Sequence, residues 1–244
     1  MPEKTDPTSA LAALRTPRLS ARYEHGYARE PKQQRSRMSF ERAVDAAVQL
    51  LVERRSDAFT LAEVADRAAV STGSIYGRVD SKVALLRAAH SREMARITAE
   101  QERAFGEAPP EDEHLSETVV RVIRTLADLL HRNAPVLKPF MVLADHDSSV
   151  ADLGKPGYDS MVAAFCNALL RCRHEISHPD AERAVAWSCT VVYSVLARWL
   201  GLGSAPLAAG EGDWESILTN LSEMVTAFLL LEPSPTASMP AVRA

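Results

Sequence analysis

Ser71, Thr72, Gly73 and Ser74 are small residues that could approach a charged polymer closely, and Tyr76 follows them. Serine and threonine hydroxyls can donate to phosphate oxygens, and glycine lets the backbone itself come near. The tyrosine could stack on a sugar, donate to a phosphate or touch a thymine methyl group; alternatively, it could pack against the preceding helix. This combination favours contact with nucleic acid if a helix presents it.

Two helix-start signals would position these residues. Thr60 followed by Glu63 predicts a capping box, with Phe59 and Val64 at the staple positions around it. Ser71 can cap a second helix shortly afterwards. Only a tight turn fits between them, as is typical of a helix-turn-helix. The apolar stripe of the first helix consists of Leu61, Val64, Ala65 and Ala68.

A further amphipathic helix is predicted on each side of this segment. The preceding helix would begin after a cap at Ser39 and end near Arg55. The following one would begin after Asp80 or Ser81 and run to about Phe105, joining the two halves of the chain. The first three helices can share one small core. The periodic positions are Phe40, Ala43, Val44, Ala47, Val48 and Leu51 before the motif, and Val83, Leu86, His90 and Ile97 after it.

The rest of the chain also shows helical periodicity, and no segment shows convincing strand-like alternation. The expected fold is therefore all-α, with a larger helical domain after the helix-turn-helix. The expected segments are a linker over 106–113, a helix from 115 that stops before Pro135, an apolar piece over 136–143 interrupted by Pro139, a polar loop over 145–157, a helix over 161–172, a helix over 179–200 with Pro179 at its first position, a connection over 201–212 and a helix over 214–228.

Charge is unevenly distributed along the 244 residues, although the formal net charge is only −4. Residues 1–38 hold eight Lys/Arg against four Asp/Glu, residues 39–90 hold seven of each, and the remainder holds thirteen against twenty-one. Any argument for nucleic acid must therefore rest on local charge. We expect residues 1–38 to form a mobile basic arm in which Lys32, Arg35 and Arg37 contact DNA, or else a merely solvated tail.

Other chemistries find little support in the sequence. No nucleophile elbow, zinc-protease motif or phosphate-binding glycine loop occurs, so we expect no enzyme and no cofactor. Cys172, His174 and His178 could be a fragment of a metal site or of a thiol sensor, but three loosely spaced groups make a weak signal. The cysteine number is odd, and neither a secretory segment nor a bilayer-long apolar run is evident, which favours a cytoplasmic protein.

Residues 39–90 resemble the N-terminal domain of TetR/AcrR-family transcriptional regulators. The matching segments are Phe59-Thr60-Leu61, Val64-Ala65-Asp66-Arg67-Ala68, Val70-Ser71, Gly73-Ser74-Ile75-Tyr76 and Ser81-Lys82. The resemblance implies a homodimer, usually a repressor, that binds a palindromic operator and changes its DNA affinity when a small molecule enters the C-terminal domain. It assigns domains to 39–90 for DNA binding and 91–232 for effector binding and dimerisation, with a disordered tail over 233–244.

Expected DNA contacts follow from this resemblance, with Thr60 alternatively serving only as a cap. Three departures from the family pattern affect the expected contacts with the operator. Ala69 stands where a turn glycine is common, Gly77 where a larger side chain is usual, and Val79 where phenylalanine is usual. The expected DNA-contacting residues are Thr60, Ser71, Thr72, Gly73, Ser74, Tyr76, Arg78, Lys82, Arg35 and Arg37.

The effector pocket and the dimer interface are expected in the C-terminal helices, where each pocket candidate could equally be plain core. The alternatives left open are a helical module that senses a small molecule or an oxidant without binding DNA, and an all-α enzyme. The expected pocket residues are His131, Phe140, Met141, Tyr158, Phe165, Trp187 and Tyr193, and the expected interface residues are Val191, Val195, Trp199, Ile217, Leu221, Met224 and Phe228.

Overall fold

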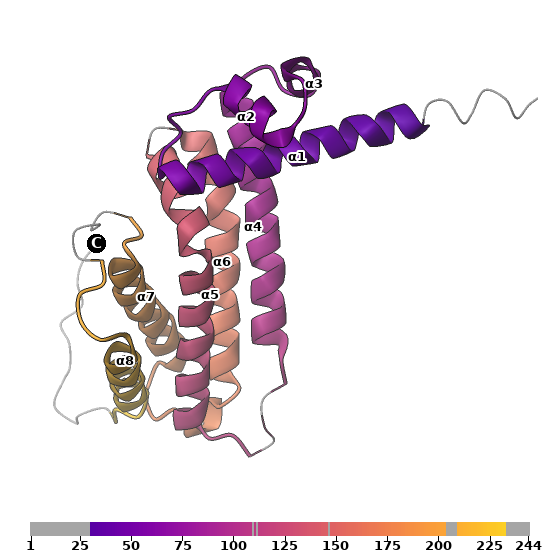
Figure 1. The fold of residues 1–244 in the computed structure, drawn as a ribbon. Helices are drawn as coiled ribbons and strands as arrows, with labels where there is room; N and C mark the ends of the chain where they lie inside the picture. Colours follow the sequence, from indigo (N-terminus) through magenta and orange to yellow (C-terminus); the bar gives the residue numbers. More distant parts are fainter. Residues whose placement is uncertain (1–29, 109, 111, 146, 204–208, 233–244) are drawn as a thin grey trace, which may run out of the picture.

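Two groups of helices make up the fold, and one long helix belongs to both (Figure 1). The computed structural model describes residues 30–108, 110, 112–145, 147–203 and 209–232. Within these residues the chain is helical and contains no strand, so the expected all-α class is confirmed. The helices are α1 (Glu30–Arg54), α2 (Leu61–Ala68), α3 (Thr72–Tyr76), α4 (Lys82–Gly106), α5 (Leu115–Ala144), α6 (Ser148–Leu170), a short 3-10 turn η2 (Arg173–Glu175), α7 (Ala181–Leu200) and α8 (Trp214–Leu229).

The helix starts around the helix-turn-helix lie where the capping signals predicted them. The Thr60 hydroxyl accepts from the amide of Glu63 at 3.2 Å, and the Glu63 carboxylate accepts from the amide of Thr60 at 2.8 Å, completing the capping box. Ser71 accepts from the amide of Ser74 at 3.1 Å. Of the two candidate caps for α4, Ser81 is the one used.

One small core holds α1, α2, α3 and the start of α4 together. Val44, Leu51 and Val64 are buried in it, and Ile75 is the residue by which the short α3 is anchored. Phe140 of α5 belongs to the same core and is only 1% exposed, although it comes from the C-terminal helices. A second core forms among α4 to α8. The expected domain boundary at residue 90 therefore falls inside α4, which packs into both.

The expected mobile arm is wrong over residues 30–38, because α1 begins at Glu30 rather than at Ser39. Apolar periodicity starts only at Phe40, so a criterion based on burial misses the exposed first turns. Those turns are rich in Gln and Arg, which have high helix propensity, and Pro31 is tolerated in a first turn. Lys32, Arg35 and Arg37 therefore fall in a helix that projects past the helical body (Figure 1).

Two breaks predicted at prolines and one predicted loop are helical in the structure. Helix α5 continues through Pro135 and Pro139, and α6 continues through Pro156, so the predicted stop at 135, the separate apolar piece and the 145–157 loop are wrong. An interior proline costs about 3 kcal/mol, and burial on both sides of Pro135 and Pro139 can exceed that cost. In α5 this burial includes Ala134 and Phe140. Pro156 is exposed, and the nearest buried residues of α6 are Val150 and Met161.

Smaller expectations also differ from the structure. Pro179 precedes the cap of α7, which is Asp180, instead of opening the helix. Val83 is 45% exposed and does not join the core. The linker after α4 and the last helix lie as expected. Residues 1–29, 204–208 and 233–244 lie outside the described residues, as do the arm, part of the 201–212 connection and the tail that we expected there. None of the described helices is long and apolar enough to span a membrane.

Ala69 ends α2 in the left-handed region, with φ 51° and ψ 49°, where a glycine avoids the steric cost of Cβ. Ala69→Gly should therefore raise the free energy of unfolding by about 0.5–1 kcal/mol, since the relieved strain exceeds the added chain entropy. Ala62→Gly, at an exposed position in the first turn of the same helix, is the control and should lower it, by at most about 0.5–1 kcal/mol. Chemical denaturation measures both, and equal destabilisation by the two variants would contradict the prediction.

Candidate nucleic-acid interface and internal cavity

Helix α3 buries one side chain and presents the others. Ile75 is fully buried, whereas the neighbouring Tyr76 is 55% exposed. The helix itself lies at the outer end of the molecule (Figure 1). More than half of Tyr76 is therefore left open by packing against the other helices. Ser71, Gly73 and Ser74 are exposed and Thr72 is partly exposed. The structure thus brings these residues together on one open surface of the N-terminal domain.

Two ion pairs fix the angle between α2 and α1. Arg54 bonds to the Glu63 carboxylate, and Arg67 bonds to Glu53. The hydrogen bond from Arg54, together with that from the amide of Thr60, lowers the pKa of Glu63 to about 2. Glu63 is thereby shared between the helix cap and the neighbouring helix, and it holds the start of α2 in place.

The expected cationic contacts differ in how free they are. Arg35 and Arg37 are exposed on the first turns of α1. The Arg78 guanidinium lies 6.0 Å from the centroid of the Phe40 ring. Lys82 is already engaged, because its ammonium donates to the backbone oxygen and carboxylate of Asp57 at 2.6 and 3.0 Å. A phosphate at Lys82 would have to share that ammonium, so its DNA contact stays a prediction.

A cavity of about 290 Å³ lies among α4, α5, α6 and α7. Four of the seven expected pocket residues line it: Phe140, Met141, Tyr158 and Tyr193. The other three do not. His131 lines a separate recess beside Gly201 and Gly210, Phe165 is fully buried in the C-terminal core, and Trp187 is 58% exposed on α7.

His90 is the cavity residue that sequence reasoning did not single out. It lies in the apolar stripe of α4, and the sequence pattern predicts for it only a place on the buried face of that helix. Its side chain is 4% exposed, its ring centroid lies 4.6 Å from that of Phe140, and its Nδ1 has no hydrogen-bond partner within the part of the chain that the structure describes. Burial lowers the pKa of this imidazole, which keeps it neutral. A histidine in an apolar stripe was the available signal.

Comparison with known proteins decides the family. Residues 43–89 match the family described as bacterial regulatory proteins, tetR family. The N-terminal domain of this chain is a DNA-binding domain of the TetR family. The resemblance noted in the sequence is confirmed over these residues, which hold the helix-turn-helix. None of the curated proteins matches the sequence of this chain.

Solved structures of the TetR type share the fold at low identity. A putative TetR-family transcriptional regulator from Mesorhizobium loti is 17% identical, with a TM-score of 0.61 over 80% of this chain and 96% of that one. Salmonella enterica GusR is 20% identical, with a TM-score of 0.54 over 78% and 95%. The regulator FadR from Bacillus subtilis, solved in complex with stearoyl-CoA, is 14% identical, with a TM-score of 0.53 over 78% and 97%.

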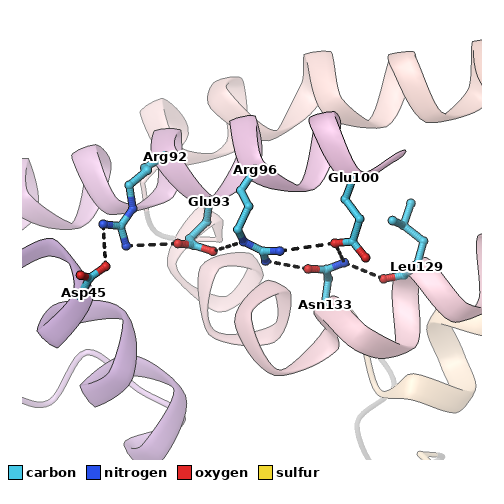
Figure 2. Close-up of polar contacts among 7 residues, drawn as sticks. All are labelled: Asp45, Arg92, Glu93, Arg96, Glu100, Leu129 and Asn133. Carbon is cyan, nitrogen blue, oxygen red and sulfur yellow. Dashed lines mark hydrogen bonds and ion pairs between the residues drawn. The ribbon is translucent and has the colours of Figure 1, made fainter. Parts of the chain in front are cut away.

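A chain of charged and polar groups ties the TetR DNA-binding domain to the helices behind the cavity (Figure 2). Arg92 bonds to Asp45 of α1 at 2.7 Å and to Glu93 at 3.2 Å. Arg96 then bonds to Glu93 at 2.8 Å and to Asn133 of α5 at 2.7 Å. Glu93 is 7% exposed, so it depends on both arginines for its charge. Helix α4 is thereby held on both sides.

The residues expected at a dimer interface differ in how far the chain itself buries them. Leu221 lies in the chain's own core, 5% exposed, and Trp199 packs on Trp214 with ring centroids 4.4 Å apart. Met224 is 47% exposed. Val191, Val195, Ile217 and Phe228 are half-buried on α7 and α8. Two helices therefore carry apolar side chains that the chain itself only partly covers.

The groups proposed for metal or thiol chemistry are not arranged for it. Cys172 is buried with its sulfur 3.3 Å from the Thr118 hydroxyl, whereas the His174 side chain is 78% exposed. Among the described residues, no three potential ligands cluster around a common point. Burial raises the pKa of Cys189 to about 12 and also raises that of Cys166, so neither thiol ionises readily.

Acid should reveal the role of Glu63. Its pKa in the folded protein, about 2, lies below its ordinary value of 4.5. A carboxyl with a lowered pKa stabilises the fold above the unfolded pKa and loses that contribution as the pH falls towards the folded value. Between pH 4.5 and 2 the unfolding temperature of the wild type should therefore fall more steeply than that of Glu63→Gln.

Thermal unfolding followed by circular dichroism at several pH values measures this difference. Glu107→Gln is the matched control, because Glu107 is exposed and takes part in none of the ion pairs among the described residues. Parallel curves for the wild type and Glu63→Gln would contradict the assignment of Glu63 as the acid-sensitive cap of α2.

Proposed function

We propose that this protein is a ligand-responsive repressor that binds a palindromic operator as a homodimer and loses DNA affinity when a small molecule enters the cavity among α4 to α7. The observation that carries the proposal is the position of Phe140, which lines the cavity and is also part of the core of the DNA-binding domain. The proposal includes no catalytic step and no cofactor, and it places the protein in the cytoplasm.

DNA binding would use the open surface of α3 and its surroundings. The N-terminus of a recognition helix and its small side chains can approach the major groove, and Tyr76 supplies the one large exposed group there. Thr60, Arg78 and Lys82 would contact phosphates around it, and Arg35 and Arg37 would add contacts from α1. Because the groups on α3 are small, specificity would depend strongly on Tyr76 and on backbone amides.

Ligand binding would act on the DNA-binding domain directly, through residues that belong both to the cavity and to the N-terminal core. A molecule that displaces Phe140 or His90 disturbs the N-terminal core directly, because Phe140 belongs to it and the two rings are neighbours. The charged chain from Asp45 to Asn133 would then move α1 with α4 (Figure 2). The FadR structure with stearoyl-CoA supports ligand binding in this fold, although it does not identify the ligand here.

The DNA function predicts a clear effect for Tyr76→Ala. A palindromic duplex from the region upstream of the protein's own gene should bind in the nanomolar range at moderate salt, and this variant should weaken it about tenfold or more. Fluorescence anisotropy with labelled duplex measures both values. The loss follows from removing the largest contact group on α3.

The control for this experiment is Arg103→Ala, at the end of α4 away from α3, which should leave the affinity unchanged. Equal affinity of the wild type for the palindrome and for random duplex would contradict the repressor. That result would favour the remaining alternative, a helical sensor that has lost specific DNA recognition, for which Ala69 and Gly77 are the supporting departures.

The homodimer would form through α7 and α8, as a four-helix interface. Met224→Glu should shift the protein towards monomer at micromolar concentration, because it places a charge on the exposed apolar face of α8. Sedimentation velocity measures the shift. Met38→Glu, at a position of 60% exposure on α1, is the matched control and should leave the dimer intact. A wild-type protein that sediments as a monomer at this concentration would refute the interface.

A further inference from the structure

We propose that the cavity among α4, α5, α6 and α7 binds a compact, ring-containing apolar molecule with one hydroxyl group, and that this hydroxyl forms a hydrogen bond with the imidazole of His90. The inference rests on the proposed function only in using the same cavity. Ligand binding is measured without DNA, so the two can succeed or fail separately.

The size of the cavity limits the ligand. Its volume is about 290 Å³. Small-molecule sites span about 300–1,000 Å³, so this one lies at the lower end of that range. A molecule of one or two rings fits such a space, whereas a long acyl chain would extend beyond it.

The walls favour a flat apolar body. Met94 and Ile97 of α4, Leu137 and Phe140 of α5, and Met161 of α6 line the cavity. Thioether sulfurs and aromatic rings both contact ring edges and faces favourably. Tyr158 and Tyr193 close another side, with ring centroids 5.2 Å apart in an edge-to-face arrangement.

Among the polar groups of the wall, His90 is the buried one that lacks a hydrogen bond within the described residues. Gln101 already donates to the Ser160 hydroxyl at 3.0 Å, and Lys155 is paired with Asp159 on the exposed side of α6. The imidazole of His90 has no such partner in the described part of the chain, and because its Nδ1 atom is fully buried and closed off from the cavity, a ligand would meet the ring through Nε2. A ligand that covers Nε2 without a hydrogen bond would leave this nitrogen without water or a partner, which is costly, whereas a ligand that supplies the hydrogen bond avoids that cost.

A hydroxyl suits this imidazole better than a carboxylate does. Neutral imidazole has one nitrogen that donates and one that accepts, and a hydroxyl can bond to either. A carboxylate can only accept, and it would bind best to a protonated ring. Burial disfavours that protonated form by lowering the pKa of His90.

A matched pair of probes tests the inference. 2-Naphthol and naphthalene have the same ring body and differ by one hydroxyl, so their affinity ratio isolates the polar contact. By isothermal titration calorimetry on the full-length protein, 2-naphthol should bind about tenfold more tightly than naphthalene. The fatty acid stearate should show no binding. In His90→Phe the ratio of the two naphthalene probes should fall to about one.

Two further variants keep the result interpretable. His90→Gln retains a hydrogen-bonding side chain, so it should keep part of the hydroxyl preference if His90→Phe fails to fold. Gly154→Leu fills the space beside the imidazole, since a Cβ there would lie 4.0 Å from His90 Cε1, and it should abolish binding of both probes. His90→Phe should also raise the unfolding temperature of the free protein, because it removes the buried atom without a partner.

The outcomes separate this inference from the proposed function. An unchanged probe ratio in His90→Phe, tight binding of stearate, or failure of both naphthalene probes to bind would each overturn the ligand class, even if the protein binds its operator. Binding with the expected ratio would support it. If operator affinity then stays the same with saturating 2-naphthol, the ligand class stands and ligand-responsive repression is wrong.

Discussion

The packing of Phe140 is the constraint on which the two halves of this molecule depend. Its ring fills the core formed by α1 to α4, yet its backbone belongs to α5, whose other residues build the C-terminal core. Deleting a buried phenylalanine side chain typically costs about 3–5 kcal/mol, so this one contact holds the domains together strongly. Because the same ring faces the cavity, neither domain can repack there without the other responding.

The N-terminal domain could be predicted in detail because its structure is encoded locally. The hydroxyl of Thr60 and the carboxylate of Glu63 serve amides a few residues away, and Ser71 does the same for α3. Such contacts need only the right residues at the right spacing. The family resemblance, confirmed over residues 43–89, adds the roles of the exposed groups but not their surroundings. That Lys82 bonds to Asp57 could not be read from either.

What the sequence did not reveal depends on contacts between distant segments. Proline signals favoured breaks at Pro135 and Pro139, but tertiary burial overrides this local preference at both. The polar composition of 145–157 favoured a loop, yet α6 runs through Pro156. Residues of four helices line the cavity, and sequence periodicity does not show which of them face one another. Four of the seven expected pocket residues therefore line it, and His90 was not among the seven. The predicted start of α1 was wrong for the opposite reason. Its first turns have helix propensity, but they bury no apolar residues that would indicate a helix in the sequence.

The extension of α1 changes what its arginines can do. A helix of 25 residues is about 37 Å long, and one end of α1 is fixed in the N-terminal core by Val44 and Leu51. Arg35 and Arg37 therefore lie on a rigid helix instead of a flexible chain. A rigid helix loses less conformational entropy on meeting a partner than a coil does, but it reaches only points on its own line. The direction of α1, more than the number of its charges, therefore determines which phosphates of a duplex Arg35 and Arg37 can reach.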